Sequence, residues 1–433
     1  MTDRPRPAQS NLRWGLMIGI IAPLTFVMSL DRTNIAVSAP IIAKQFHFSL
    51  VQMSLILTSF TWTYAFLQIP GGILAERQGA RRTLTWANAW WSFWTIMTAL
   101  GTSVASFIGI RGLLGIGQAT DWSASVEAIN RWFPKSERAR GNSILLGGLY
   151  LGPIVGGPLT VAIVKGLGWQ WSFYIYGVAG IATAILWWVY FRDRPQQHPR
   201  ISEAELKHIE AGYEGVETRS VSTWRDWGHF IRNYRFWALG LQYFFLIFVQ
   251  SFFTVWLPTY LLNTRHFSLT AMGFGASLPF VALFAMVLIS GQWQDRVYQR
   301  TGSKTRARVP FAVSGFILAA VFLIIASRTL NPVLMLVFLM VSLGSVGLVQ
   351  TAIWPTVGDV AGNMTGSVTG WTNFWGNFSG GLGPIFTALL VGLTKSWSSA
   401  LLVMSLAALI GAVLWLVIQP DKPLEAGLLQ AAD

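Results

Sequence analysis

Long apolar segments separated by short polar connections run along almost the whole chain. A transmembrane helix needs about 20 mostly apolar residues to cross the hydrocarbon core of a bilayer. Twelve segments approach or exceed that length, at residues 14–40, 52–75, 83–101, 103–131, 141–164, 171–191, 236–262, 270–293, 309–327, 331–355, 360–391 and 398–419. The pattern therefore predicts an all-α membrane protein with twelve transmembrane helices.

One longer polar stretch interrupts this series after the sixth segment. It covers residues 192–235 and separates six predicted helices from six others. We therefore expect an N-terminal six-helix bundle in 1–191, a cytoplasmic linker in 192–235 and a pseudo-symmetric C-terminal six-helix bundle in 236–433. The linker is too short for an output domain, which argues against a membrane-bound sensor.

A short motif occurs at matching places in the two halves. GILAERQGARR and GQWQDRVYQR each occupy the predicted loop after the second helix of their half. In each copy an acidic residue lies four positions after the first glycine and an arginine follows it, which gives Gly72, Glu76 and Arg77 in one half and Gly291, Asp295 and Arg296 in the other. Parallel half-repeats are typical of transporters that bind their substrate near the bilayer midplane.

Composition and charge support a membrane location. Only 11% of the residues are charged, against roughly 25% in a soluble domain. With both termini placed in the cytoplasm, 24 of the 31 lysines and arginines fall in cytoplasmic segments and 5 in external ones, as the positive-inside rule requires. This distribution accounts for the net charge of +13 without a nucleic-acid partner.

Several classes of chemistry lack the residues that they need. The chain has no cysteine, and its five histidines fall in predicted loops or helix ends, so no metal or cofactor site is expected. No P-loop motif is present, which argues against ATP-driven transport. No catalytic constellation is visible in the spans, so we expect a protein that is not an enzyme. The first apolar segment is too long for a signal peptide and is expected to remain as the first helix.

Three charged residues lie in the outer half of the predicted spans. Asp31 and Arg32 are roughly 26 Å along the first span, and Arg111 is roughly 12 Å below the outer face in the fourth, so the two sites have similar depth. A charge at mid-bilayer costs at least about 2.5–3.5 kcal/mol. A purely structural ion pair rarely adds stability over apolar packing, so we expect a functional role. Their sum of +1 suits one carboxylate, which guanidinium groups bind bidentately.

The fourth span presents further residues on the face of Arg111. Gln118 and Trp122 fall within about 20° of that face at 100° per residue, so both are expected to bind substrate. Asp121 lies roughly 80° away and grazes the cavity at most, whereas Glu127 points nearly opposite, near the cytoplasmic end. In the second half, polar and aromatic candidates are Gln250, Thr351, Trp354, Asn373, Trp375 and Asn377.

The repeated motif resembles the loop signature of the major facilitator superfamily, with Glu76 where aspartate is usual. The resemblance implies a cytoplasmic gate in which the acid meets a helix N-terminus and the arginines meet carboxylates. Residues expected in this gate are Gly72, Glu76, Arg77, Arg81, Asp295 and Arg296. An anion at a helix N-terminus gains roughly 0.3–2 kcal/mol. The alternative is that these residues are only positive-inside anchors.

Other segments narrow the resemblance to one branch. SLDRTNIAV, YAFLQIPGG, RGLLGIGQA, NRWFPKSERARG and DRPQQHPRISEAEL are similar to the anion:cation symporters, which include bacterial permeases for hexuronates, galactonate, glucarate and aromatic acids. The resemblance covers essentially the whole chain. It implies proton-coupled uptake of a small organic anion by alternating access, with Tyr64, Trp354 and Asn377 lining the site. We expect a monomer in the inner membrane of a bacterium.

Two positions depart from the sugar-acid permeases of that branch. Gln118 stands where those relatives have a glutamate that takes the proton, and an amide cannot titrate. Either Asp31 or Asp121 then carries the proton, or the chain is an exchanger or uniporter without proton coupling. Asp31 suits a switch in which substrate draws the arginine away and the carboxylate takes a proton. Leu149 replaces a glutamine that holds hydroxyls, which argues against a cargo with many hydroxyl groups.

Overall fold

The computed structural model describes residues 11–134, 137–210, 230–361 and 365–424. Regular structure in these ranges is entirely helical, and no strand occurs in them, which confirms the predicted all-α class. Each of the twelve predicted spans corresponds to a helical segment. Among the described helices, ten are long and apolar enough to cross a membrane. The other two predicted spans contain the polar-ended helix α4 and the short helices α5 and α6.

The first half of the chain begins with one continuous helical segment. It consists of α1 (Leu12–Leu16), the π-helical turn η1 (Met17–Ile21) and α2 (Ala22–Phe46). The helices that follow are α3 (Leu50–Gln78), α4 (Ala80–Thr98), α5 (Val104–Gln118), α6 (Asp121–Trp132), α7 (Arg138–Leu167) and α8 (Trp169–Tyr190). A 3₁₀ turn, η2 (Pro195–Gln197), and a short helix, α9 (Glu203–Glu210), lie in the predicted linker.

The second half also begins with a composite segment. It contains α11 (Tyr234–Ser251), η3 (Phe252–Trp256), α12 (Leu257–Thr259) and η4 (Tyr260–Thr264). The helices that follow are α13 (Leu269–Thr301), α14 (Lys304–Arg328), α15 (Pro332–Ala361), α16 (Thr365–Thr394) and α17 (Trp397–Val417).

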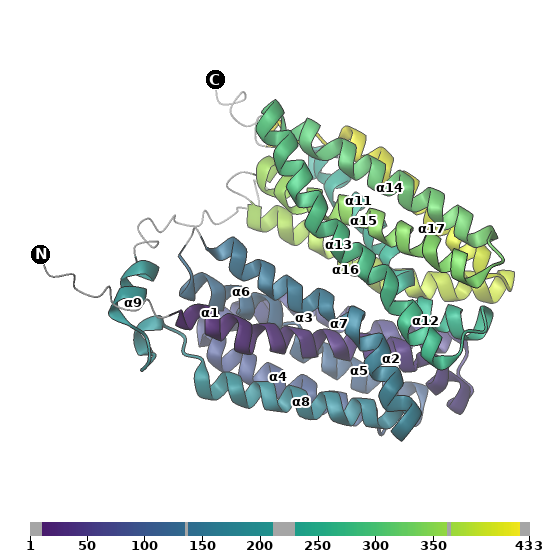
Figure 1. Cartoon of the computed structure of the whole chain (residues 1–433), viewed down its shortest axis with the longest axis horizontal. Helices are drawn as coiled ribbons and strands as arrows, with labels where there is room; N and C mark the ends of the chain where they lie inside the picture. Colours follow the sequence, from purple (N-terminus) through teal and green to yellow (C-terminus); the bar gives the residue numbers. More distant parts are fainter. Residues whose placement is uncertain (1–10, 135–136, 211–229, 362–364, 425–433) are drawn as a thin grey trace, which may run out of the picture. The chain divides into compact units, whose positions relative to one another are not determined.

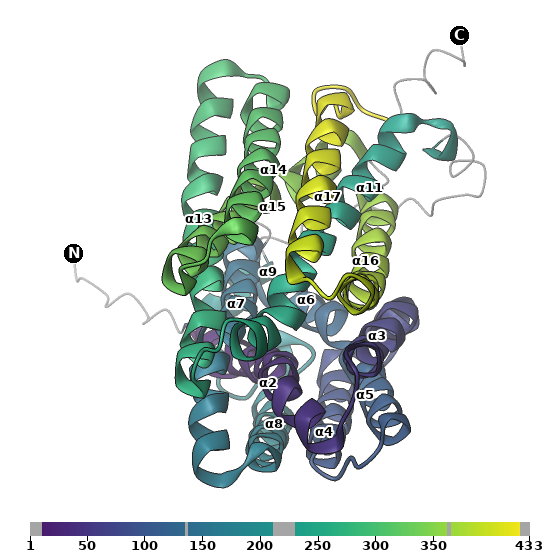
Figure 2. The same cartoon turned by 90° about the vertical axis from the view of Figure 1, so that its right-hand side faces the viewer.

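The chain folds as two compact units, one formed by residues 1–35 with 59–217 and the other by 36–58 with 218–433. Within the first unit α4 packs against α5 and α8 (Figure 1). Within the second unit α14 packs against α13, α15 and α17 (Figure 2). The predicted boundaries at 191 and 236 remain a prediction, since part of the linker lies outside the described residues.

Apolar side chains cover the outward faces of the helices as well as the core. Large apolar residues that stay exposed include Ile185, Leu186 and Val189 on α8 and Leu406, Val413 and Leu416 on α17. A helix that is apolar on all sides is buried or spans a membrane. Lipid therefore takes the place of water around these helices.

Close helix packing in the first unit depends on glycine. A Cβ atom added at Gly152 of α7 would lie 2.1 Å from the Ser29 hydroxyl of α2. The same hydroxyl donates a hydrogen bond of 2.6 Å to the backbone carbonyl of Leu149. Small residues at such positions allow two transmembrane helices to approach closely.

The structure corrects two sequence predictions about helix boundaries. The predicted span 103–131 is interrupted at Ala119 and Thr120, which separate α5 from α6. The repeated motif was predicted in loops, but its residues lie mainly in the last turns of α3 and α13. Hydropathy marks where the apolar residues end, but the helix continues into polar residues because its backbone hydrogen bonds persist up to the next turn. Here the turns occur at glycines with positive φ, Gly79 after α3 and Gly302 after α13.

Candidate functional site

Two arginines from different spans lie against one aromatic ring inside the first unit. The Cζ atom of Arg32 on α2 is 5.0 Å from the ring centroid of Phe60, and that of Arg111 on α5 is 5.3 Å from the same centroid. Arg111 is only 2% exposed. The structure therefore brings Arg32 and Arg111 close together, as their similar depth predicted. Phe60 was not identified from the sequence. Contacts between a guanidinium group and an aromatic ring are favourable. The two guanidinium groups repel each other, however, so a negative group bound between them would stabilise the pair.

Arg32 brings two more predicted residues into the site. Its Nε donates a hydrogen bond of 3.0 Å to Gln118 Oε1 at the end of α5. Its Cζ lies 4.9 Å from the ring centroid of Tyr64. Phe60 and Tyr64 are one turn apart on α3 and their rings stack at 5.7 Å. The structure thus groups Arg32, Arg111, Tyr64 and Gln118, all four predicted from the sequence.

Asp31 is the buried acid beside this arginine pair. It is 1% exposed, and its Oδ2 accepts a hydrogen bond of 3.2 Å from the Thr95 hydroxyl on α4. Its Oδ1 has no hydrogen-bond partner among the described residues. Arg111 and Arg32 both attract the carboxylate electrostatically. Among the described residues, Asp31 forms no direct ion pair. Sequence reasoning missed Thr95, because a threonine inside an apolar helix carries no distinctive signal.

Asp121, the first residue of α6, is the second buried acid of the site. It is also 1% exposed, and neither carboxylate oxygen has a hydrogen-bond partner among the residues that the structure describes. Its electrostatic partner is Arg32. The helical-wheel estimate allowed Asp121 only to graze the cavity. That estimate was drawn through one unbroken helix, and the interruption at Ala119–Thr120 removes its basis.

This second acid changes the charge of the site. Asp31, Arg32 and Arg111 alone would sum to +1, as the sequence analysis assumed. Including an ionised Asp121 brings the formal sum to zero. A single proton on either aspartate restores +1. The net charge of the cluster therefore depends on the protonation of its two carboxylates.

The site borders an apolar wall within the first unit. Phe60 belongs to a buried cluster with Leu24, Met28, Ala87, Trp91 and Leu114, and Tyr64, Trp94 and Leu149 pack against it. Trp122 packs instead against another cluster, which includes Leu16, Met17 and Trp132. Its predicted role in substrate binding therefore has no support from a contact with the arginine pair.

The predicted residues of the second unit lie on α15 and α16, apart from Gln250 on α11. Trp354 is 38% exposed, and its ring meets that of Tyr243 edge-on at 5.3 Å between centroids. Asn373 and Asn377 lie four positions apart on α16, so they share one face of that helix. Their substrate-binding role remains a prediction.

The predicted gate residues occupy the ends of α3, α4 and α13. The backbone N–H of Arg81 donates a hydrogen bond of 2.9 Å to the Asp193 carboxylate. Its guanidinium donates a hydrogen bond of 2.7 Å to the Trp188 carbonyl and lies over the Trp188 ring, with Cζ 4.2 Å from the ring centroid. Asp193 thus supplies the acid at the N-terminus of α4. Arg77, Asp295 and Arg296 are exposed. The Glu76 side chain is not described by the structure, so the cytoplasmic gate remains a prediction.

A charged contact that the sequence analysis missed joins two helices of the second unit. Asp359, near the end of α15, forms an ion pair with Lys304, whose Nζ lies 3.0 Å from Oδ1, and a second ion pair with Arg308. Both cations lie in the first two turns of α14. This contact fixes the start of α14 to the end of α15.

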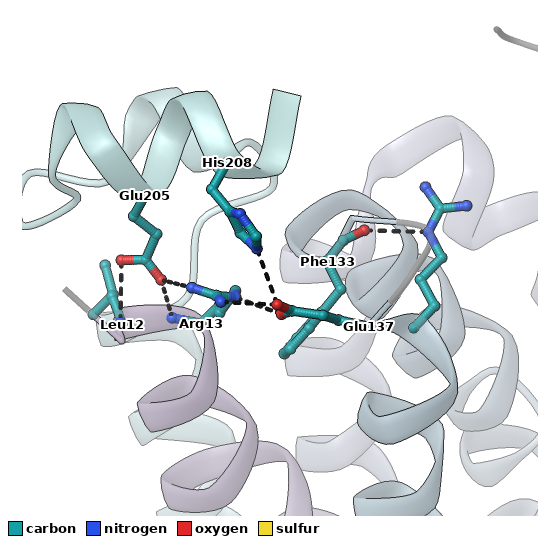
Figure 3. A network of polar contacts seen from close by, with 7 residues as sticks. Leu12, Arg13, Phe133, Glu137, Glu205 and His208 are labelled. Carbon is teal, nitrogen blue, oxygen red and sulfur yellow. Dashed lines mark hydrogen bonds and ion pairs between the residues drawn. The ribbon is translucent and has the colours of Figure 1, made fainter. Parts of the chain in front are cut away.

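A second polar network ties the short helix α9 to the start of α1 (Figure 3). Glu205 of α9 accepts hydrogen bonds from the backbone N–H groups of Leu12 at 3.2 Å and Arg13 at 3.0 Å. Arg13 Nη1 donates to the same carboxylate at 3.0 Å. Glu205 therefore caps the first helix and neutralises its arginine. The linker position of this acid gave no sign of such a contact.

Glu137, just before α7, completes this network (Figure 3). Its carboxylate accepts a hydrogen bond of 2.9 Å from Arg13 Nε, and its other oxygen lies 2.9 Å from His208 Nε2 of α9. The hydrogen bond from Arg13, opposed by partial burial and reinforced by His208, lowers the pKa of the Glu137 carboxyl below its usual value. The network joins α1, α7 and α9 on one side of the first unit.

These helices and this charge cluster define a multi-pass membrane protein with ionisable residues buried among its spans. The model of the Major Facilitator Superfamily matches residues 21–384, so the chain belongs to that family. Solved structures of a bacterial homologue of the human lysosomal transporter Spinster, unoccupied and occupied, share the fold with TM-scores of 0.72 and 0.73 at 18% identity. They cover 95% and 96% of this chain.

Several transporters resemble the chain along nearly its whole length. The probable sulfoacetate transporter of Cupriavidus necator is 27% identical over 406 residues, which are 94% of each chain. The D-galactonate transporter of Escherichia coli is 29% identical and covers 96% of this chain and 97% of its own length. A probable galactarate/D-glucarate transporter of Escherichia coli, GarP, is 28% identical, with 94% of both chains covered. This similarity confirms the predicted resemblance to anion transporters and agrees with the expectation of a protein that is not an enzyme.

Proposed function

We propose that this chain is a secondary transporter that imports a small organic carboxylate together with protons by alternating access. The observation that carries the proposal is the arginine pair, half-buried Arg32 and buried Arg111, against the Phe60 ring. Two guanidinium groups can bind one carboxylate through parallel hydrogen bonds. Ionisable residues inside a membrane protein are usually part of a substrate or proton pathway.

Proton coupling follows from the charge balance of the site. With Asp31 and Asp121 both ionised, the cluster is formally neutral and an added carboxylate would bring in an uncompensated negative charge. Protonation of one aspartate leaves +1, which the cargo then neutralises. Binding of the proton and of the anion therefore favour each other, and this coupling is reciprocal. Coupled binding of this kind is what a symporter requires.

The cargo that we propose is a compact carboxylate with few hydroxyl groups. The named relatives carry sulfoacetate, D-galactonate or galactarate and glucarate, and all of these are small organic anions. Leu149 contributes an apolar side chain to the wall beside Phe60 where a glutamine would bind hydroxyls. Trp354, Asn373 and Asn377 are proposed as the contribution of the second unit.

We also propose that the protein lies in the inner membrane of a bacterium as a monomer with both termini cytoplasmic. The uneven distribution of lysine and arginine supports this orientation. Gly72, Glu76, Arg77, Arg81, Asp295 and Arg296 are proposed to belong to the cytoplasmic gate.

Reconstitution into proteoliposomes tests the transport reaction. Uptake of labelled sulfoacetate, D-galactonate, D-glucarate and benzoate would be measured with and without an imposed inward proton gradient. We expect sulfoacetate or benzoate, which carry no hydroxyl group, to accumulate against its gradient only when the proton gradient is present. Accumulation of neither, or of D-galactonate and D-glucarate alone, would contradict the proposed cargo class.

Gln118 favours a second candidate, an exchanger or uniporter, because the amide cannot titrate. The discriminating measurement is the external pH of deenergised vesicles after the transported anion is added. Symport alkalinises the medium as protons enter with the cargo, whereas exchange or uniport leaves its pH unchanged.

A further inference from the structure

The two buried aspartates of the site have different surroundings. Asp31 accepts a hydrogen bond from Thr95 at 3.2 Å, whereas Asp121 has no hydrogen-bond partner on either oxygen among the described residues. Both are 1% exposed, so burial does not distinguish them. A hydrogen bond to the ionised form of a carboxylate favours that form. A buried carboxylate without a partner bears the full desolvation cost of its charge.

Charged and titratable neighbours separate the two acids further. Asp31 faces Arg32 on its own helix, Arg111 from α5 and the phenol of Tyr176 from α8. Among the described residues, the charged neighbour of Asp121 is Arg32. Thr95 from α4 is the remaining partner of Asp31. Two arginines and a hydroxyl thus stabilise a negative charge on Asp31, and one arginine stabilises a charge on Asp121.

We propose that these acids have separate roles: Thr95 holds Asp31 as the fixed negative partner of Arg111, and Asp121 carries the coupled proton. This inference rests on the proposed function and assigns the proton within the same site. It differs from the sequence-based hypothesis, in which Asp31 was the switch. Thr95 is a positioning residue, because it acts through its hydrogen bond to the Asp31 carboxylate.

The assignment leads to a simple sequence of events at Arg32. While Asp121 is ionised, its charge and that of Arg32 attract each other. A hydronium ion then transfers a proton to the Asp121 carboxylate and leaves water, and the new O–H bond removes that negative charge. Arg32, which also donates to Gln118 at 3.0 Å, becomes available to an incoming carboxylate. Release of the cargo restores the attraction and favours loss of the proton.

Infrared difference spectroscopy of the full-length protein in phosphatidylcholine–phosphatidylglycerol vesicles tests this assignment without any cargo. The signal is the carbonyl stretch of a buried protonated carboxyl group, recorded as the pH is lowered from about 9 to about 5, the range in which buried acids titrate. We expect the wild type to show this signal and Asp121→Asn to lose it. Asp31→Asn should retain it, displaced to lower pH because Arg111 loses its counter-ion.

Matched variants at position 95 test the positioning role. Thr95→Val keeps the shape but lacks the hydroxyl, so we expect a second protonated carboxyl to titrate in this variant. Thr95→Ser retains the hydroxyl and should match the wild type. Asp121→Glu keeps the proton carrier and should give a displaced signal if Asp121→Asn fails to fold.

Three results would overturn the inference. They are a wild type without the signal, a signal lost in Asp31→Asn but kept in Asp121→Asn, and identical titrations for Thr95→Val and Thr95→Ser. Because no cargo is present, failure here leaves the transport proposal standing. Failure of anion accumulation in proteoliposomes would leave the infrared assignment measurable.

Discussion

Glu205 binds Arg13 twice, through the backbone N–H and through the guanidinium, both at 3.0 Å. One carboxylate from α9 thus caps the first helix and balances its buried charge, although the two residues lie 192 positions apart. The Glu205 side chain is fully enclosed, so solvent does not compete for these hydrogen bonds. The contact makes α9 a structural part of the first unit, although it lies in what the sequence suggested was a linker.

Substitution of Glu205 should destabilise the protein measurably. Removing one partner of a buried hydrogen-bonded group costs roughly 1–3 kcal/mol, so Glu205→Gln should lower the melting temperature of the detergent-purified protein. Glu203→Gln, an exposed position on the same helix, is the matched control and should have little effect. Equal melting temperatures for both variants would show that the α9 contact contributes no stability.

The Glu137 carboxyl should make stability depend on pH in the acid range. Its pKa is lowered in the folded state, chiefly by the hydrogen bond from Arg13. Its stabilising effect is therefore complete above the unfolded value of about 4.3, and it disappears as the pH falls through the lower folded value. Melting temperatures of wild type and Glu137→Gln, measured across this window, should converge at the acid end. A constant difference between the two would contradict the argument.

Gln118→Glu should make anion binding more dependent on pH. The new carboxyl would lie within hydrogen-bond distance of Arg32, since the present oxygen is 3.0 Å from its Nε. An extra negative charge should weaken carboxylate binding at neutral pH, and acidification should restore it. The measurement is the apparent Kd of a transported anion against pH. Gln118→Met, which removes the hydrogen bond without adding charge, is the control, and identical pH profiles for both variants would refute the prediction.

The twelve spans were predictable because lipid imposes a simple requirement of length and apolarity. Helix ends were less predictable, since Gly79 and Gly302 stop α3 and α13 beyond the point where hydropathy falls. The interruption at Ala119–Thr120 was also missed. A short turn between two helices leaves the apolar pattern of a span almost unchanged.

The arginine pair could be predicted from the sequence because a charge inside a span is rare and its depth can be counted along the helix. Phe60 and Thr95 could not, because aromatic and hydroxyl residues are common in spans and only the packing of α3 and α4 brings them to the site. Asp121 was predicted as a possible proton carrier, although the helical wheel placed it at the edge of the cavity. Contacts between distant segments, such as Glu205 with Arg13, leave no local pattern.

The central claim is that the pair formed by Arg32 and Arg111 recognises the cargo carboxylate. Uptake of a transported anion into proteoliposomes by Arg111→Gln is the most direct test, with Arg328→Gln, an exposed arginine at the end of α14, as control. Truncating one partner of a buried charge pair costs about 2–5 kcal/mol, so we expect uptake by Arg111→Gln to fall at least about 30-fold and that by the control to remain near wild type. Wild-type uptake by Arg111→Gln would contradict the account.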